Sequence, residues 1–514
     1  MRSLFRNARF AVLPILVGLL CARPSTQDLP PPTVTPGVQP PPGMTVGAFT
    51  VDGDRNVYYV GQSSDPDFPT TPGAHSDRCG VDGECGQTFF GRRYADVVLV
   101  KMGNDGVLKR STFVGGDGQL SPRFIALGPD DSVYVAGEFL ENRYIGPQRL
   151  PFVNPTVPGC GQYDIFVARL DPSDFSLIYW TCIQGRVQQA PITIFDLAVD
   201  HTGSAIVGGY VNNREFPLHS ALIPVYRGYP GYIKKLLPNG DVAFSTIFGG
   251  SRSDQIWSLA VDRQGDIYVA GTAQSADLPV SRPFQASLNG VTDAFLAKID
   301  KDGRILLFST YFGGSYVDVI WGVATDNNGD VWVVGDTHSI DFPTTADALR
   351  PVTLCGRNQD CANRNPSAFA ARFDSTGRLR YSTLLGPEQV NPVGPGGARL
   401  DDVLVGPNNA VHLLGSFTDG MTLVRPLTTQ PCGYSCGMLM TLGPRGDIRF
   451  ASRVPSGRSM MSFTAGARGR WTLGPDGDLY LLRQTPEFAT EMIVIAVTPP
   501  TNTKLTRGAL AGVK

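Results

Sequence analysis

The chain has 514 residues and a formal net charge of −2, with 18% charged residues, 59 glycines and 41 prolines. This composition is typical of a turn-rich β protein, and it lacks the basic excess that nucleic-acid binding would require. The length alone would suit several domains, so the internal organisation of the sequence decides their number.

The N-terminus has the pattern of an export signal. Three arginines, the last of them Arg9, precede the apolar run 10–20, which is too short for a bilayer that needs about 20 residues. We therefore expect residues 1–21 to be a signal peptide. Cys21 resembles the lipidated cysteine of bacterial lipoproteins, although Leu20 stands where that signal has Gly, Ala or Ser. An outer-membrane-anchored lipoprotein and a secreted or cell-surface protein both stay open.

Residues 22–43 are expected to be a tether. They include PSTQDLPPPTVTPGVQPPPG, which is too rich in proline to build a packed core. At about 3.1 Å per residue in polyproline II, such a segment would hold the following domain up to about 60 Å from an anchor. A tether of this kind suits a lipid anchor.

From residue 44 onward the sequence repeats a unit of four short strands. In the clearest copy the strands are expected at 256–261, 266–271, 294–299 and 306–312. Each strand is rich in Val, Ile, Phe and Tyr, and the turns DRQG and DKDG join the first to the second and the third to the fourth. The unit is therefore predicted to be an antiparallel meander.

The residue that closes the second strand sets the register of the repeat, with steps of 76, 72, 62, 64, 80 and 68 residues. A four-stranded sheet repeated radially is a β-propeller, so we predict an all-β fold of seven blades over residues 44–514. The seventh unit lacks chain for a fourth strand, which either residues 502–510 or the N-terminal segment must supply. The marker residues are Gly61, Gly137, Gly209, Gly271, Gly335, Gly415 and Arg483.

Units four and five carry the motifs GDIYVAGT, DAFLAKIDKDG and FSTYFGGSYVD, and DFPTT occurs at both Asp67–Thr71 and Asp341–Thr345. On these motifs the chain resembles the bacterial seven-bladed β-propeller repeat family (SBBP). The match is specific in units one, four and five and weak in units six and seven. The resemblance implies an exported bacterial propeller, and the family has no agreed enzymatic activity to transfer.

Eight cysteines besides Cys21 form four local pairs, and an even number in an exported chain favours disulfides. In an up-and-down blade all four pairs fall at the face that carries the second-to-third loops and the links between blades. A zinc site would need four thiolates from neighbouring blades, and the spacing is not that of the usual zinc knuckle. The expected disulfides are Cys79–Cys85, Cys160–Cys182, Cys355–Cys361 and Cys432–Cys436.

No catalytic constellation stands out, and we expect neither a catalytic residue nor a cofactor. The five histidines fall in different units at unrelated positions of the repeat. The acidic segment Asp326–Asp330 suggests a calcium-binding loop, but it lacks the ligand spacing and the distal Glu of an EF-hand loop. A hairpin turn explains it more simply.

Trp257 and Trp321 occupy equivalent positions in the first strands of units four and five, as do Asp254 and Asp318. One interpretation is structural: the tryptophans fill the packing between blades and the carboxylates cap turns. The functional interpretation places Asp254 and Asp318 near the mouth of the central channel, where they could hold a cation or a sugar hydroxyl.

The second-to-third loops hold nearly all the length variation, so we predict that partners bind the face that carries them. Tyr and Arg are the side chains most enriched at binding hot spots. The alternative is that these residues only pack their own loops. The candidate contacts are Arg92, Arg93, Tyr94, Arg143, Tyr144, Tyr226, Arg227, Tyr229 and Tyr232.

Two classes of function stay open. The first is a non-enzymatic surface module that binds a protein or a glycan, because fold alone fixes no activity and propellers without a catalytic set are usually recognition platforms. The second is an extracellular polysaccharide hydrolase or lyase with acidic residues near the channel. A clustered pair of perturbed carboxylates would favour the enzyme, and aromatic and arginine side chains on an open rim would favour the binder.

Overall fold

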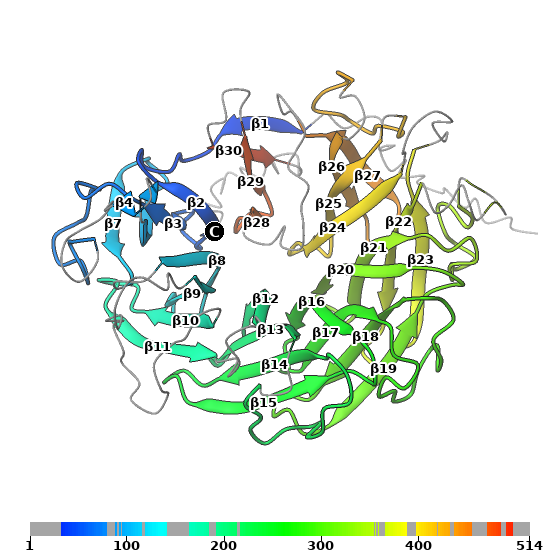
Figure 1. The fold of residues 1–514 in the computed structure, drawn as a ribbon. Coiled ribbons are helices and arrows are strands. Elements are labelled where there is room, and N and C mark those ends of the chain that lie inside the picture. The colour runs from blue at the N-terminus through cyan, green and yellow to red at the C-terminus, as the bar shows by residue number, and fades with distance from the viewer. Residues whose placement is uncertain are drawn as a thin grey trace, which may run out of the picture.

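The computed structural model describes residues 32–79, 88–89, 92–93, 95–115, 119–140, 164–183, 192–212, 216–353, 355, 358, 365–387, 397–418, 420–431, 436–454, 470–484 and 490–496. Within these ranges every regular element is a strand, and the strands form seven four-stranded antiparallel sheets and one short ribbon. The sheets stand around a central axis (Figure 1), which confirms the all-β, seven-bladed propeller. No helix in the described ranges is long and apolar enough to cross a membrane.

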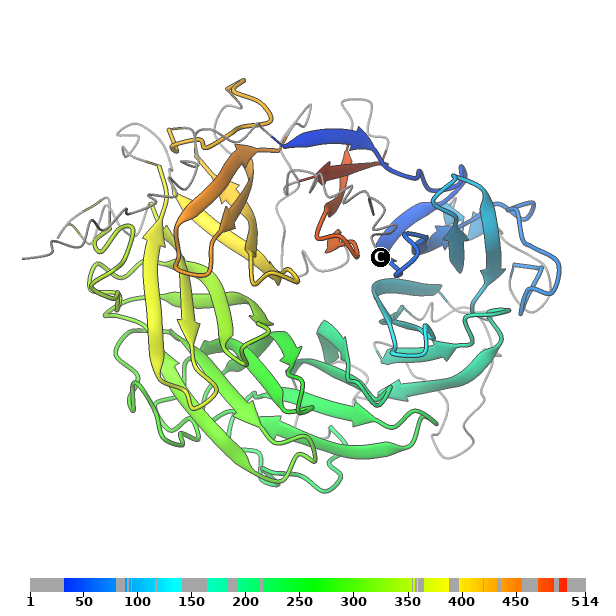
Figure 2. The ribbon, with the colours of Figure 1, turned by 180° about the vertical axis from the view of Figure 1, so that it is seen from behind.

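Six blades take their four strands from consecutive stretches of chain, with the first strand nearest the axis and the fourth on the outside (Figures 1 and 2). Their strands are β2 Thr45–Val51, β3 Val57–Ser63, β6 Asp96–Met102 and β7 Leu108–Phe113; β8 Gln119–Leu127, β9 Val133–Leu140, β10 Ile165–Leu170 and β11 Leu177–Ile183; β12 Ile192–Val199, β13 Ala205–Val211, β14 Gly231–Leu236 and β15 Val242–Phe248; β16 Asp254–Val261, β17 Ile267–Ala273, β18 Asp293–Ile299 and β19 Leu306–Phe312; β20 Asp318–Thr325, β21 Val331–Thr337, β22 Ser367–Phe373 and β23 Leu379–Leu385; and β24 Ala398–Val405, β25 Val411–Phe417, β26 Cys436–Leu442 and β27 Ile448–Arg453. The ribbon β4 Thr88–Phe89 and β5 Arg92–Arg93 lies between β3 and β6.

Blade seven is built from both parts of the chain. Its inner strands are β28 Trp471–Leu473, β29 Leu479–Gln484 and β30 Thr490–Ala496, and its outer strand is β1 Thr33–Pro36. The blue β1 therefore lies beside the brown β30 in Figure 1. Of the two ways to complete this blade, the N-terminal one is correct. Pairing the two ends of the chain closes the ring, and closure leaves fewer exposed sheet edges.

The prediction that residues 22–43 form a tether is wrong for the part that includes β1. Beyond β1, Gly37 N donates to Met492 O at 3.0 Å, and the Gln39 amide bonds both backbone groups of Met492 at 3.0 Å each. The propeller thus begins by Thr33. Proline is tolerated there because an outer strand needs hydrogen bonds on one side only.

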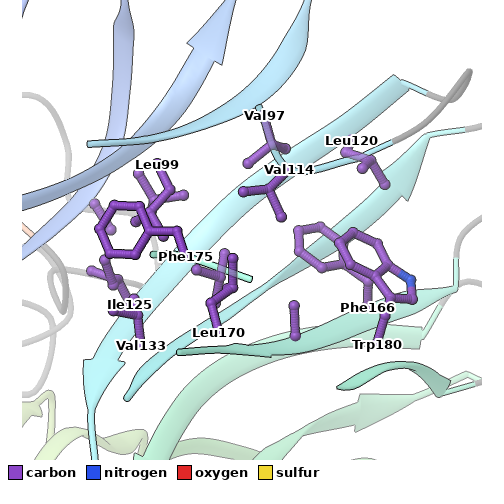
Figure 3. Close-up of a cluster of buried hydrophobic side chains, with 14 of the residues drawn as sticks. Val97, Leu99, Val114, Leu120, Ile125, Val133, Phe166, Leu170, Phe175 and Trp180 are labelled. Carbon is purple, nitrogen blue, oxygen red and sulfur yellow. The ribbon is translucent and has the colours of Figure 1, made fainter. Parts of the chain in front are cut away.

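The hydrophobic core is divided among the blade interfaces. The described residues form seven clusters of buried side chains, and each cluster lies between two neighbouring blades. Figure 3 shows the cluster between blades one and two, where Leu99 of β6 lies beside Phe175, and Phe166 and Trp180 lie in the other half of the cluster. The stacked rings of Phe166 and Trp180 have centroids 4.8 Å apart. Strand alternation supplies one apolar face to each neighbour, so every blade needs both.

The second-to-third loops are fastened along the outer strands. In blade four, Ser309 exchanges backbone hydrogen bonds with Ser281 at 2.8 and 3.2 Å, and the Thr310 hydroxyl accepts one from Gln285 N at 2.8 Å. This explains the Ser-Thr pair of the repeat motif. The loops cover backbone groups that an edge strand would otherwise offer to another chain. The equivalent acceptors in other blades are Thr112, Thr246, Thr383 and Ser452.

Candidate binding site at the mouth of the central channel

Six innermost strands carry a β-bulge at the same point of the repeat. A bulge leaves one extra residue without a cross-strand partner and re-aims its side chain. Each bulge lies in the first half of its strand, and the first strands begin at the face with the second-to-third loops and the blade links. The unpaired residues are Gly47, Arg123, Phe195, Trp257, Trp321 and Asp401.

The bulged side chains reach the second strand of the same blade at a fixed spacing. Trp257 Nε1 donates to Thr272 Oγ1 at 3.2 Å, and Trp321 Nε1 donates to Asp336 Oδ1 at 2.5 Å, each across 15 residues. In blade two the same spacing gives an ion pair of 2.8 Å between Arg123 and Glu138. The repeat therefore uses one backbone device to present different chemistry in each blade.

Three aromatic bulge residues form a continuous ladder across blades three, four and five. The centroids of Phe195 and Trp257 are 4.3 Å apart with ring planes at 34°, and those of Trp257 and Trp321 are 4.8 Å apart at 53°. We call these three residues the aromatic collar. All three are half-buried, and none belongs to the seven core clusters.

Arg399 of blade six ends the ladder. Its guanidinium lies 3.8 Å from the centroid of Trp321, and its Nε lies 2.5 Å from Asp401 Oδ1. Burial raises the pKa of Asp401 to about 7, against the lowering effect of Arg399. Burial also raises the pKa of Asp336, while its bond from Trp321 opposes the change. Both carboxyl groups are buried, and each is bonded to or paired with a side chain of the ladder, Asp336 with Trp321 and Asp401 with Arg399.

Beyond the bulges, toward the hairpin-turn face, the innermost strands enclose a cavity of about 350 Å³. Its lining comes from the first strands of all seven blades, and polar and apolar atoms contribute almost equally to its surface, with Leu197, Leu259, Val323 and Trp471 among the side chains. The channel therefore has two different halves: the aromatic collar at the loop end and this cavity at the turn end.

Two buried carboxylates in the cavity wall join neighbouring blades. Asp196 Oδ2 accepts from Leu259 N at 2.6 Å, and Asp402 Oδ2 accepts from Trp471 Nε1 at 2.8 Å. Both groups are almost inaccessible to solvent. They satisfy backbone and indole donors in the interface, as buried polar groups require.

Asp254 and Asp318 have the capping role that the structural interpretation assigned to them. Asp254 accepts from Gly250 N at 2.7 Å and from Ser275 Oγ at 2.6 Å, and Asp318 accepts from Gly314 N at 2.8 Å. Both are fully buried and tie a blade link to the neighbouring loop. Burial raises the pKa of Asp318 to about 7. Neither carboxylate is placed to contact a ligand at the surface.

The four candidate residues of blade three differ in accessibility. Tyr232 is fully buried in β14, and Tyr226 packs its own loop with its hydroxyl donating to Phe216 O at 2.7 Å. Arg227 and Tyr229 are exposed, with side-chain exposure of 66% for Arg227 and 48% overall for Tyr229. Arg227 lies 3.7 Å from Asp277. Only this second pair is available to a partner.

Only some of the remaining candidate residues lie within the described ranges. Arg92 and Arg93 lie in β5, whereas Tyr94, Arg143 and Tyr144 lie outside the described residues, as do the signal peptide and Cys21. One cysteine of each expected pair, namely Cys79, Cys182, Cys355 and Cys436, lies within the described ranges, and Cys85, Cys160, Cys361 and Cys432 lie outside them. The four disulfides stay a prediction.

Metal ligands do not gather in the described ranges, where no group of three His, Cys, Asp or Glu side chains is placed to hold an ion. In the segment Asp326–Asp330, Asp326 Oδ1 accepts from Asn328 N at 2.8 Å and from Asp330 N at 3.0 Å. These are the bonds of a capped hairpin turn.

The sequence interpretation missed Phe195 and Arg399 as parts of one site. The equivalence of Trp257 and Trp321 was visible in the register, and counting back one unit would have reached Phe195. Arg399 could not be found in this way, because it lies two residues before the bulge of its own strand and reaches Trp321 across the blade interface.

Comparison with known proteins identifies the repeat. The SBBP beta-propeller repeat matches residues 243–279, and a search among curated proteins finds no relative. A chain of a mitotic checkpoint complex has a TM-score of 0.43 and 11% identity over 96% of this chain and 98% of that one. The polysaccharide lyase Uly1 has a TM-score of 0.40 and 11% identity over 88% and 89%. A catalytically inactive virginiamycin B lyase from Staphylococcus aureus has a TM-score of 0.39 and 8% identity over 90% and 99%.

These structures resemble this chain in fold alone. The repeat match covers the end of blade three and the first two strands of blade four, where the motifs of the sequence are clearest. This chain is therefore a seven-bladed β-propeller that carries the SBBP beta-propeller repeat.

Proposed function

We propose that this protein is an exported, non-enzymatic binding module for a macromolecular or glycan partner. The partner docks at the loop end of the propeller, where the aromatic collar opens and where Arg227 and Tyr229 are exposed. The protein reaches the cell surface through its N-terminal signal, either lipidated at Cys21 or released, and the four local disulfides stiffen its loops. Stiff loops lose less entropy when a partner binds.

The observation that best supports this proposal is that the three side chains of the aromatic collar are only half-buried. Two other tryptophans, Trp180 and Trp332, are almost completely buried within blade interfaces, which is where a purely structural tryptophan gains most. Phe195, Trp257 and Trp321 instead keep part of their surface in solvent at one end of the channel. Gathered aromatic side chains next to an arginine are the usual composition of a binding hot spot.

A polysaccharide hydrolase or lyase is the second candidate, because Asp336 and Asp401 lie beside the collar and both have raised pKa values. A carboxyl group that keeps its proton near neutral pH is what general acid catalysis needs. Against this, Asp336 accepts the Trp321 indole bond and Asp401 is paired with Arg399, so both oxygens nearest the collar are engaged. Binding is therefore the better-supported function.

The test is an unbiased capture of partners with the protein purified from residue 22 onward, combined with a glycan array. We expect a retained protein or glycan, and we expect Arg227→Ala with Tyr229→Ala to weaken binding at an unchanged melting temperature. Tyr226→Ala serves as the structural control, because loss of its buried hydroxyl bond should lower the melting temperature instead. New reducing ends or unsaturated sugars released from a bound glycan would favour the enzyme, and no retained partner in either assay would contradict the proposal.

A further inference from the structure

We propose that the aromatic collar, together with Thr193, Tyr210 and Gln255 beside it, binds a neutral polysaccharide chain at the loop end of the central channel. This inference rests on the proposed binding function and names its ligand. A pyranose ring offers apolar C–H faces and a rim of uncharged hydroxyl groups. The collar and its neighbours offer the complementary surface.

The spacing of the rings excludes a flat aromatic ligand inserted between them. Insertion needs a gap of about 7 Å, because each pair of stacked rings is separated by about 3.5 Å. The collar centroids are only 4.3 and 4.8 Å apart, so each gap is already closed. The angles of 34° and 53° turn the rings progressively instead of stacking them flat. A ligand must therefore lie across successive exposed ring edges and faces, as a chain of sugar rings does.

The charges around the collar are already paired within the protein. Arg399 is paired with Asp401 at 2.5 Å and covers one face of Trp321, and Arg123 is paired with Glu138 at 2.8 Å. An acidic or basic ligand would have to compete with these pairs, whose carboxylate members Asp401 and Glu138 are mostly buried. A neutral ligand needs no counter-charge.

Uncommitted neutral polar groups adjoin the collar. Gln255 is the cross-strand partner of Thr272, which bonds Trp257, and Thr193 pairs with Tyr210 at the same position of blade three. All three side chains are half-buried, and in the described ranges none has a hydrogen-bond partner. Amide and hydroxyl groups both donate and accept, so they match the hydroxyl groups of a sugar. Charged neighbours would select a different ligand.

Binding to polysaccharides is measured by affinity electrophoresis and by tryptophan fluorescence, with the protein from residue 22 onward. The probes are soluble β-glucan, mannan and xylan, with polygalacturonate and a sulfated galactan as the charged arm. We expect retardation by at least one neutral polymer and about thirtyfold weaker binding after Trp257→Ala, as for a hot-spot aromatic. Trp257→Phe should keep part of the affinity. Gln255→Leu, which leaves the ladder intact, should weaken binding about tenfold, the loss expected for one hydrogen bond to a ligand.

Phe284→Ala is the matched control, since Phe284 is an exposed aromatic residue of a second-to-third loop away from the collar. Its affinity should equal that of the unchanged protein. Unchanged binding in both Trp257→Ala and Gln255→Leu, or a preference for the charged polymers, would overturn the inference. A captured protein partner without any neutral glycan would also overturn it while the proposed binding function stands. If neither a protein nor a glycan is retained, the proposed function itself fails.

Discussion

In blade four, the buried Lys298 ammonium lies 2.8 Å from Asp262 and 3.2 Å from Asp266, and 5.0 Å from the ring centroid of Tyr268. Blade six places neutral groups at the same point. His412 takes the position of Tyr268 and Thr441 that of Lys298, and the two side chains form a hydrogen bond of 3.0 Å. Gly406 and Ala410 stand where blade four has its two aspartates.

The comparison shows that the cation and the carboxylate it pairs with change together. A carboxylate stabilises a buried lysine ion and a cation stabilises a buried carboxylate, so losing only one partner of the pair is costly. Blade one keeps the pair of Lys101 with Asp52, although Asn56 stands at the position of the second aspartate. Blade six has lost all the charges and replaced them with a self-sufficient neutral pair. This is why its repeat motif looks degraded in the sequence although its four strands are complete.

The substitution expected to lower the stability most is Lys298→Met. The substitution leaves Asp262 and Asp266 without their cation and should destabilise the protein by about 3–5 kcal/mol in urea unfolding. Lys109→Met is the control: its pair with Asp105 is exposed and should contribute less than about 1 kcal/mol. Transplanting the blade-six set through Asp262→Gly, Asp266→Ala, Tyr268→His and Lys298→Thr should recover most of the loss. Equal costs for Lys298→Met and Lys109→Met would show that the set is not coupled.

The neutral pair of blade six should make stability depend on pH. Burial lowers the pKa of His412 from its ordinary 6.5 to about 4. Between these values the unfolded chain binds the proton and the folded protein does not, so stability falls as pH drops from about 6.5 to about 4, by about 2–3 kcal/mol.

The measurement is the difference between unfolding curves of the unchanged protein and His412→Asn across this range. The difference is needed because Asp318 and Asp401, with pKa values raised to about 7, act in the opposite direction as the pH falls. Asp200, whose pKa is lowered, contributes a loss only below 3.8. A difference that does not vary between pH 6.5 and 4 would contradict a buried neutral histidine.

Two neighbouring lysines in blade three allow a second comparison, between a buried lysine with an ion pair and one without. Lys235 is paired with Asp200 at 2.8 Å, whereas Lys234 is buried without an ion pair in the described ranges, and burial lowers its pKa to about 8. At pH 7 an unpaired buried charge is costly, so Lys234→Met should stabilise the protein by about 1–2 kcal/mol, and Lys235→Met should destabilise it. The unchanged protein should also gain stability as pH rises from about 8 to 10.5, because the folded state releases its proton first. Destabilisation by Lys234→Met would refute this account.

The sequence by itself determined the number and chemistry of the blades. Strand alternation, the Asp-x-x-Gly turns and the step of the marker glycines are local properties, so the seven registered units and their meander order could be predicted from residue pattern alone. The capping role of Asp254 and Asp318 could be predicted in the same way, because both residues are close in sequence to the turns they bond.

Only the tertiary structure decided how distant segments meet. β1 pairs with β30 across the whole length of the chain, and a short proline-flanked strand carries no signal of so remote a partner. The aromatic collar arises because bulges turn Phe195, Trp257 and Trp321 toward one another from three blades, with Arg399 reaching in from a fourth. Spacing along the chain fixes which residues are equivalent, but contact between equivalent residues depends on blade packing, which no local pattern encodes.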